Sequence, residues 1–162
     1  MILGLTTSAF TFLHVVISIV AIAAGFLAVF GMIANRSFSM INAIFLALTV
    51  LTSVTGFLFP FKGVTPGIVV GILSMIVLAL AIVARYVGHL AGGWRATYVV
   101  SAVIALYFNV FVFIVQSFEK VPSLKALAPT QSEPPFKIAQ GLTLLLFLVL
   151  GFLSFRRFRL EI

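Results

Sequence analysis

The chain contains no cysteine, and it has little negative charge. The first absence excludes iron–sulfur ligation, thiol redox chemistry, disulfide bonds and thioether attachment of haem. Only three residues are acidic, against ten basic ones, and the net charge is +7. Glu119, Glu133 and Glu161 all fall outside the long apolar runs of the chain. The buried carboxylate on which cation-coupled transporters usually depend is therefore missing.

The residue sets that most enzymes need are equally scarce. The chain has two histidines, His14 and His89, far apart in the sequence. Nucleophilic catalysis needs a base beside a nucleophile, and a metal site needs several ligands that converge. We therefore expect a protein that is not an enzyme and that holds no metal and no cofactor.

Long uncharged runs dominate what remains. Of the 162 residues, 63% are hydrophobic, and the mean hydropathy is +1.32. The charged side chains leave five uncharged runs, 1–35, 37–61, 63–84, 96–118 and 138–155. At about 1.5 Å rise per residue, each crosses or nearly crosses a hydrocarbon core of about 30 Å as a helix.

The predicted fold is therefore all-α, a bundle of five transmembrane helices. We expect one domain over residues 1–162, because no segment is long enough for a separate soluble domain. The helices are expected near 8–34, 38–60, 66–88, 95–118 and 136–156. The longest connection is a loop at 119–135, in which Pro122 favours the start of a short surface helix ending near Leu127.

The basic residues separate by type. Five spans place six arginines at one end, Arg36, Arg85, Arg95, Arg156, Arg157 and Arg159, and four lysines at the other, Lys62, Lys120, Lys125 and Lys137. The positive-inside rule then favours a cytoplasmic arginine end, with the N-terminus outside and the C-terminus inside. Because these cations flank apolar runs, lipid headgroups are the expected partners and nucleic acid is not.

The third span, near 66–88, combines small residues with an absence of aromatic rings over 65–84. Gly67, Gly71 and Ser74 form a face at helical spacing that allows another helix to approach closely. We expect this helix at the centre of the bundle, or against a second copy of the chain. The rings of 107–113 are expected to face lipid instead.

Polar residues within the runs are the candidate ligand-binding groups, because each costs free energy unless it is paired. His14 and Ser18 share a face of the first helix, while Asn109 and Gln116, seven residues apart, share a face of the fourth. All four fall in the outer half, and we expect them to form one polar pocket. The alternative is that they join helices by hydrogen bonds.

A second cluster is expected at the cytoplasmic end, around a short glycine-rich loop. It consists of Arg85, His89, Trp94, Arg95 and Tyr98. Cations beside interfacial aromatic rings are suited to phosphate headgroups or to the acidic surface of a partner. The alternative is that these side chains only anchor the helix ends in the interface.

The segment 89–98, His-Leu-Ala-Gly-Gly-Trp-Arg-Ala-Thr-Tyr, together with His14, faintly resembles uncharacterised small bacterial inner-membrane proteins related to four-helix b-type cytochromes. The segments 116–122 and 128–130 are similar to small bacterial membrane proteins of unknown role. The resemblance implies the cytoplasmic membrane of a bacterium and implies no activity.

Three functions stay open at this point. The first is a membrane protein that binds lipid or a small apolar molecule, or serves as an accessory subunit, with lipids, itself or another membrane protein as partners. The second is a redox protein that holds haem or quinone near His14. His89 would lie about 25 Å or more away by helix rise, which disfavours a haem held by both histidines. The third is a passive channel or transporter.

Overall fold

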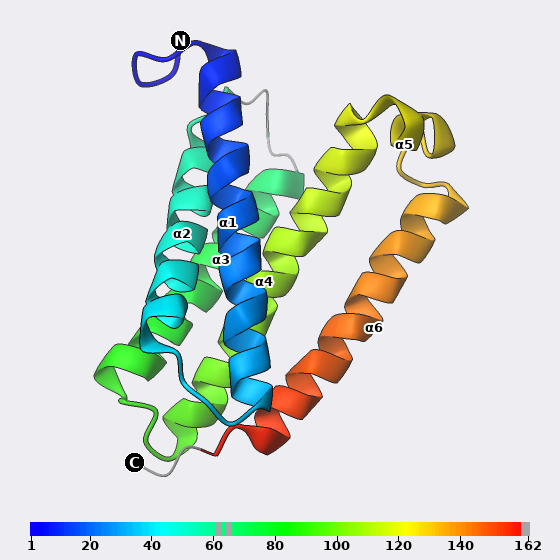
Figure 1. The fold of residues 1–162 in the computed structure, drawn as a ribbon. Helices are drawn as coiled ribbons and strands as arrows, with labels where there is room; N and C mark the ends of the chain where they lie inside the picture. The colour runs from blue at the N-terminus through cyan, green and yellow to red at the C-terminus, as the bar shows by residue number, and fades with distance from the viewer. Residues whose placement is uncertain (61–62, 64–65, 160–162) are drawn as a thin grey trace.

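The computed structural model describes residues 1–60, 63 and 66–159, without the side chain of Pro66, so Lys62 and Glu161 lie outside the described residues. The predicted all-α fold is confirmed (Figure 1). The helices are α1 (Thr7–Ile33), α2 (Ser39–Phe57), α3 (Pro66–Ile82), the π-helical turn η1 (Val83–Val87), α4 (Gly93–Lys120), α5 (Pro122–Leu127) and α6 (Pro134–Arg157).

Local signals explain several helix ends. The Oγ1 of Thr6 accepts the N–H of Ala9 at 3.2 Å and caps α1. Proline stands in the first turn of both α5 and α6, where a missing N–H costs nothing. The expected third helix does not stay α-helical to residue 88, because Gly88 N–H bonds to Val83 O at 2.8 Å and closes the wider π turn.

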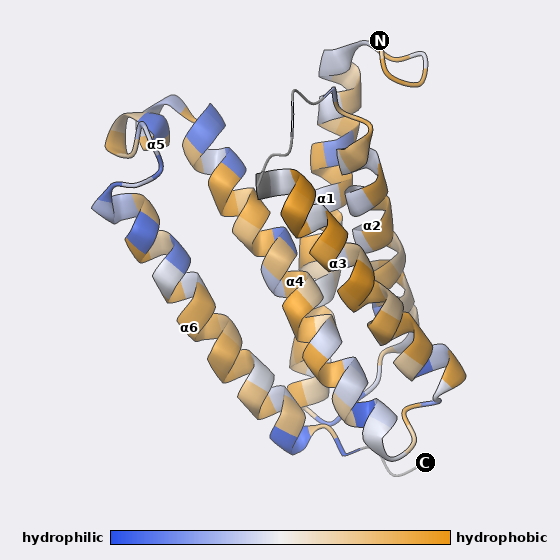
Figure 2. Ribbon diagram, turned by 180° about the vertical axis from the view of Figure 1, so that it is seen from behind, coloured by the Kyte–Doolittle hydropathy of each residue, from blue (hydrophilic) through white to orange (hydrophobic). Residues whose placement is uncertain are grey.

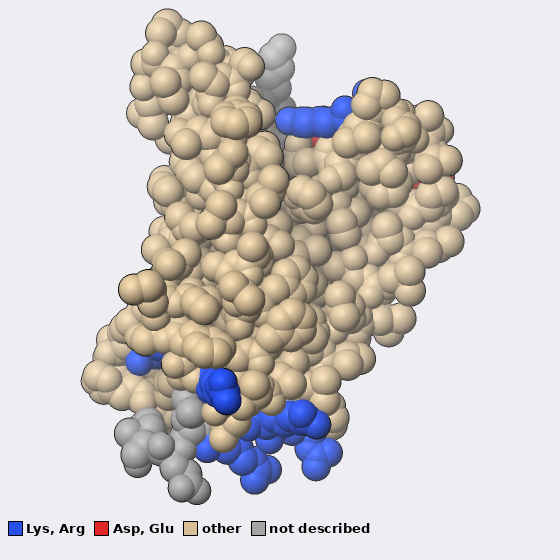
Figure 3. Space-filling model, in the orientation of Figure 1, with Lys and Arg blue, Asp and Glu red and all other residues tan. Residues whose placement is uncertain are grey.

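Five of the helices in the described part are long and apolar enough to cross a membrane: α1, α2, α3 continued by η1, α4 and α6. Their middle turns are predominantly apolar (Figure 2). The face in Figure 3 carries basic side chains at its two ends and a wide uncharged belt between them. We call the end with Arg36, Arg85, Arg95, Arg156, Arg157 and Arg159 the arginine end, and the end with Lys120, Lys125 and Lys137 the lysine end.

The central helix is α4, so the expectation that the third span lies at the centre was wrong. Helices α1, α2, α3 and α6 all contact α4. Tyr98, Ala102, Ala105 and Leu106 are fully buried along it. Several buried side chains of α4, such as Ser101, Ala102 and Ala105, are small and let neighbouring helices approach closely. Helix α3 packs mainly on α4 and α2 and exposes most of its apolar side chains.

The proposed small-residue face of α3 is used only in part. Ser74 is buried, and Gly71 lies against the ring of Phe57, but Gly67 is exposed. The expectation for the aromatic rings of α4 was also only partly right. Phe113 is exposed, whereas Tyr107 packs edge-on against Phe147 of α6 with ring centroids 5.6 Å apart.

The helices of the bundle pack closely together in its arginine half. A methyl group on Gly25 of α1 would lie 2.5 Å from Leu106 and 2.9 Å from Phe45, so three helices meet there in close contact. Toward the lysine end α4 and α6 lean away from α1 and α2, as the opposite views in Figures 1 and 2 both show. The two ends of the molecule therefore differ in packing as well as in charge.

Candidate functional site

A polar network joins three helices at the arginine end. Arg85, in the π-helical turn, donates from Nη2 to the Ser37 Oγ at 3.2 Å. Its guanidinium also lies over the ring of Tyr98, 5.3 Å from the centroid. The Nη1 of Arg85 is buried and has no hydrogen-bond partner among the described residues. This cation is therefore held by a hydroxyl and an aromatic face.

Tyr98 and Asn42 form the buried part of this network. Tyr98 is 0% exposed, and its hydroxyl donates to Asn42 Oδ1 at 2.9 Å. Asn42 Nδ2 in turn donates to Phe38 O at 3.0 Å. Tyr98 was expected to contact a headgroup or a partner, but the packing of α4 buries it. Its hydroxyl joins α4 to α2 instead.

Arg95 joins the start of α4 to the end of α6. Its Nη1 donates to the backbone oxygens of Phe155, at 3.3 Å, and of Phe158. The guanidinium also lies over the Phe155 ring, 5.8 Å from its centroid. The last carbonyls of a helix carry partial negative charge, so a cation is stabilised there.

The residues after α6 fold back under the bundle. The Phe158 ring is 1% exposed and lies 6.4 Å from the Tyr98 ring between centroids. The next backbone N–H, of Arg159, donates to Asn35 Oδ1 at 2.8 Å. These contacts fix the direction in which the tail arginines leave the bundle.

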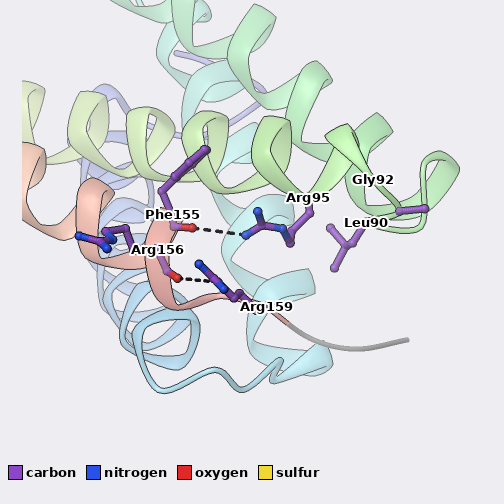
Figure 4. Close-up of a pocket in the computed structure, with 7 residues that line it drawn as sticks. Leu90, Gly92, Arg95, Phe155, Arg156 and Arg159 are labelled. Atoms are coloured by element: carbon purple, nitrogen blue, oxygen red, sulfur yellow. Dashed lines mark hydrogen bonds between the residues drawn. The ribbon is translucent and has the colours of Figure 1, made fainter.

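An open hollow of about 740 Å³ lies between the loop before α4 and the end of α6. Its lining includes Arg95, Arg156 and Arg159, and among the residues that the structure describes no carboxylate lines it. Figure 4 shows the guanidinium groups of Arg95 and Arg159 turned toward each other, whereas Arg156 points away from them. Arg159 Nε donates to Arg156 O at 3.1 Å, which holds that side chain in place. Because the positive charges of these side chains repel each other, an anion placed in the hollow would be attracted by all three.

Sequence reasoning found Arg95 but not its partners in this hollow. Arg156 and Arg159 were interpreted only as part of the basic end of the chain. The signal was the run 155–159, Phe-Arg-Arg-Phe-Arg, in which aromatic residues alternate with cations. The other two members of the expected cluster lie apart from the hollow's lining: His89 is exposed at a φ of 47°, and the Trp94 ring packs against Gly88.

The four candidates of the lysine half do not form one hydrogen-bonded group within the described residues. His14 Nδ1 lies 2.7 Å from the Thr55 Oγ1, and the Ser18 hydroxyl donates to His14 O at 2.8 Å. Asn109 Nδ2 donates to the Thr49 Oγ1 at 3.1 Å. Gln116 is exposed, and no hydrogen bond joins it to the other three within the described residues.

A second hollow, of about 350 Å³, lies between α3 and α4. Leu80 and Val100 contribute apolar surface to it. The hydroxyls of Thr97 and Ser101, which also line it, donate to carbonyls of their own helix. This hollow therefore offers apolar contact and little hydrogen bonding.

The carboxylate of Glu133, in the connection before α6, accepts several hydrogen bonds from its own turn. Glu133 accepts from the Thr130 hydroxyl at 2.9 Å and from the backbone N–H groups of Thr130 and Ser132. Desolvation alone would raise the pKa of Glu133, but these hydrogen bonds outweigh it and hold the pKa below its usual value.

The described residues include no cluster of three or more histidine, cysteine, aspartate or glutamate residues placed to hold a metal ion. Comparison with known proteins gives no further guide, because no protein-family model, no curated protein and no solved structure matches the chain.

Proposed function

We propose that this membrane protein is not an enzyme and binds the phosphate-bearing headgroups of anionic lipids at its arginine end. The supporting observation is the hollow lined by Arg95, Arg156 and Arg159, to which the described part of the chain contributes no carboxylate. A phosphate diester is a suitable occupant, because guanidinium groups donate in a fork that matches its oxygens.

The position of the hollow supports a lipid as the source of the phosphate. It lies where α4 begins and α6 ends, beside two helices that are apolar enough to span a membrane. A headgroup bound there would keep its acyl chains beside apolar helix surface. Phe155 lines the same hollow and suits the boundary between headgroup and chain.

The way the arginines are held supports selective binding rather than general attraction. Arg95 and Arg159 each donate to backbone carbonyls, so two of the three side chains are oriented before an anion arrives. An oriented side chain loses less conformational entropy on binding.

The proposal includes an orientation. With its arginine end in the cytoplasm of a bacterium, the protein follows the positive-inside rule. Anionic lipids at that face attract each nearby arginine by about 1 kcal/mol.

The test is native mass spectrometry of protein released from lipid discs that contain phosphatidylglycerol and phosphatidylcholine. The variant Arg156→Gln with Arg159→Gln removes two cations of the hollow and keeps Arg95, which also holds α6. Because each cation contributes about 1 kcal/mol, we expect the preference for phosphatidylglycerol to fall about tenfold or more.

The matched control removes two cations from the other end, as Lys125→Gln with Lys137→Gln, and should keep most of that preference. An equal loss in the two variants would mean that net charge alone attracts the lipid. No loss in either would also contradict the proposal.

A further inference from the structure

The orientation of His14 shows which of its ring nitrogens is free. Its Nδ1 lies 2.7 Å from the Thr55 Oγ1. The single proton of that hydroxyl is directed at the backbone of its own helix, with Leu51 O at 2.7 Å and Thr52 O at 3.1 Å. Threonine in a helix commonly makes this bond. The Thr55 oxygen is therefore left to accept a hydrogen bond from His14.

This arrangement assigns the proton of the neutral imidazole to Nδ1. A neutral imidazole carries one N–H, so the other nitrogen, Nε2, has a lone pair and acts as an acceptor. The structure gives Nε2 no partner among the described residues. Nε2 is also not among the buried polar atoms that lack a partner, so neighbouring atoms do not close it off.

The surroundings of the ring are aromatic and apolar. The Phe59 ring lies edge-on to it with centroids 5.3 Å apart, and the Phe10 ring packs in turn against Phe59 at 5.1 Å. On another side stands Gly56, where even a methyl group would lie 3.7 Å from the imidazole. An aromatic ring of a ligand would find matching contacts here.

The depth of His14 makes the free acceptor costly. His14 follows the start of α1 by seven residues, about 10 Å along the helix axis, which places it within the hydrocarbon region of a membrane. Water is scarce there, and an acceptor without a donor is unfavourable.

We infer that His14 Nε2 accepts a hydrogen bond from the hydroxyl of an apolar aromatic molecule bound between α1 and α2 in the lysine half of the membrane. This site is independent of the arginine hollow, because it uses a neutral acceptor rather than cations and lies at the opposite end of α1. It takes phenol-like molecules, including quinols, and rejects relatives that have no O–H.

The test uses two probes that differ only in the donor: para-dodecylphenol and its methyl ether. Protein with isotope-labelled histidine is placed in lipid discs, and its ring nitrogens are followed by NMR. We expect an Nε2 without a proton in the free protein, a shift of that signal on adding the phenol, and none with the ether. His89, exposed in its loop, is the internal reference.

Variants keep the test independent of folding. His14→Phe should weaken phenol binding about threefold to tenfold, as expected for one lost hydrogen bond, while His89→Phe should not change it. Thr55→Val keeps the imidazole but removes the group that fixes its tautomer, and should weaken binding less. A proton found on Nε2, or equal responses to phenol and ether, would overturn the inference and leave His14 as a helix-packing contact.

Discussion

The two ends of the bundle hold their helices together in different ways. At the arginine end, side chains connect segments far apart in the chain: Arg85 reaches Ser37, Tyr98 reaches Asn42, and Arg95 reaches the end of α6. In the lysine half the hydrogen bonds between helices are made by neutral side chains, as between His14 and Thr55 or from Gln140 to Phe111 O, and Glu133 holds a turn within one connection.

The choice of cation follows the same division. The planar guanidinium of arginine can donate to a carbonyl, stack on an aromatic ring and bind an anion at the same time. The ammonium of lysine is a hydrated point charge on a flexible stem. At the arginine end these properties connect helices, and three arginines line the hollow that we propose binds an anion. The three described lysines, Lys120, Lys125 and Lys137, are exposed. The comparison therefore separates an end whose arginines bond to other segments from an end whose described lysines are exposed.

The largest effect is expected where α1, α2 and α4 meet. Gly25→Ala would place a methyl group 2.5 Å from Leu106 and 2.9 Å from Phe45, both of which are buried. Overpacking of this kind should lower the free energy of unfolding by about 1–3 kcal/mol, measured by denaturant titration in detergent. Gly56→Ala, where the methyl group would only touch His14 at 3.7 Å, should be neutral or slightly stabilising. Equal effects would contradict the difference in packing.

The next effect concerns the buried network of the arginine end. Tyr98→Phe removes the hydroxyl that donates to Asn42 Oδ1 and leaves that oxygen buried without its donor. We expect a loss of about 1–2 kcal/mol in the free energy of unfolding. Tyr107→Phe is the matched control, because the Tyr107 ring packs among other rings and the described residues accept no hydrogen bond from its hydroxyl. If Tyr107→Phe lowered the free energy of unfolding as much as Tyr98→Phe, the hydrogen bond from Tyr98 to Asn42 would add nothing to stability.

A smaller effect is expected in the lysine half. Gln140 of α6 donates to Phe111 O of α4 at 3.2 Å, while its Oε1 is buried without a partner. Gln140→Leu removes the hydrogen bond to Phe111 O but also removes a buried oxygen that lacks a donor among the described residues. Because the two effects oppose each other, we expect the free energy of unfolding to change by no more than about 0.6 kcal/mol in the same titration. Gln116→Leu, at an exposed position of α4, is the reference. If Gln140→Leu lowered the free energy of unfolding as much as Tyr98→Phe, side-chain hydrogen bonds would stabilise the two ends equally.

The smallest effect is the pH response of the loop before α6. The folded pKa of Glu133 lies below its usual value of 4.5, because hydrogen bonds from Thr130 and Ser132 outweigh desolvation. The carboxylate therefore stabilises the loop above that value, and the contribution is lost as the pH falls through the folded pKa. The protection of the Thr130 and Ser132 amides against hydrogen exchange, measured relative to the intrinsic exchange rate at each pH, should fall on acidification, and Glu133→Gln should remove this dependence. An unchanged dependence in the variant would assign it to another group.

Much of the fold was predictable, because uncharged runs of about twenty residues determine where helices can cross a membrane. Pro122 likewise predicted the start of α5. The central position of α4 was not predicted, because the glycine spacing of the third span was given more weight than the small buried side chains of α4, such as Ala102 and Ala105.

The arginine hollow was predictable only in part. Arg95 and Arg159 are 64 positions apart in the sequence, and they meet because α6 returns to the start of α4. Periodicity describes one helix at a time and does not say which helix ends meet. The tautomer of His14 was similarly out of reach, because it depends on a hydroxyl of another helix.

The most direct test of the central claim is photo-crosslinking with phosphatidylglycerol that carries a photoreactive group on its headgroup, followed by mass spectrometry of the crosslinked peptides. The account predicts crosslinks concentrated in the segments 90–95 and 155–159, which contain the residues that line the hollow. It also predicts that Arg156→Gln with Arg159→Gln removes most of them. Crosslinks spread equally over the lysine end, at 120–137, would contradict the claim that the arginine end is the lipid-binding end.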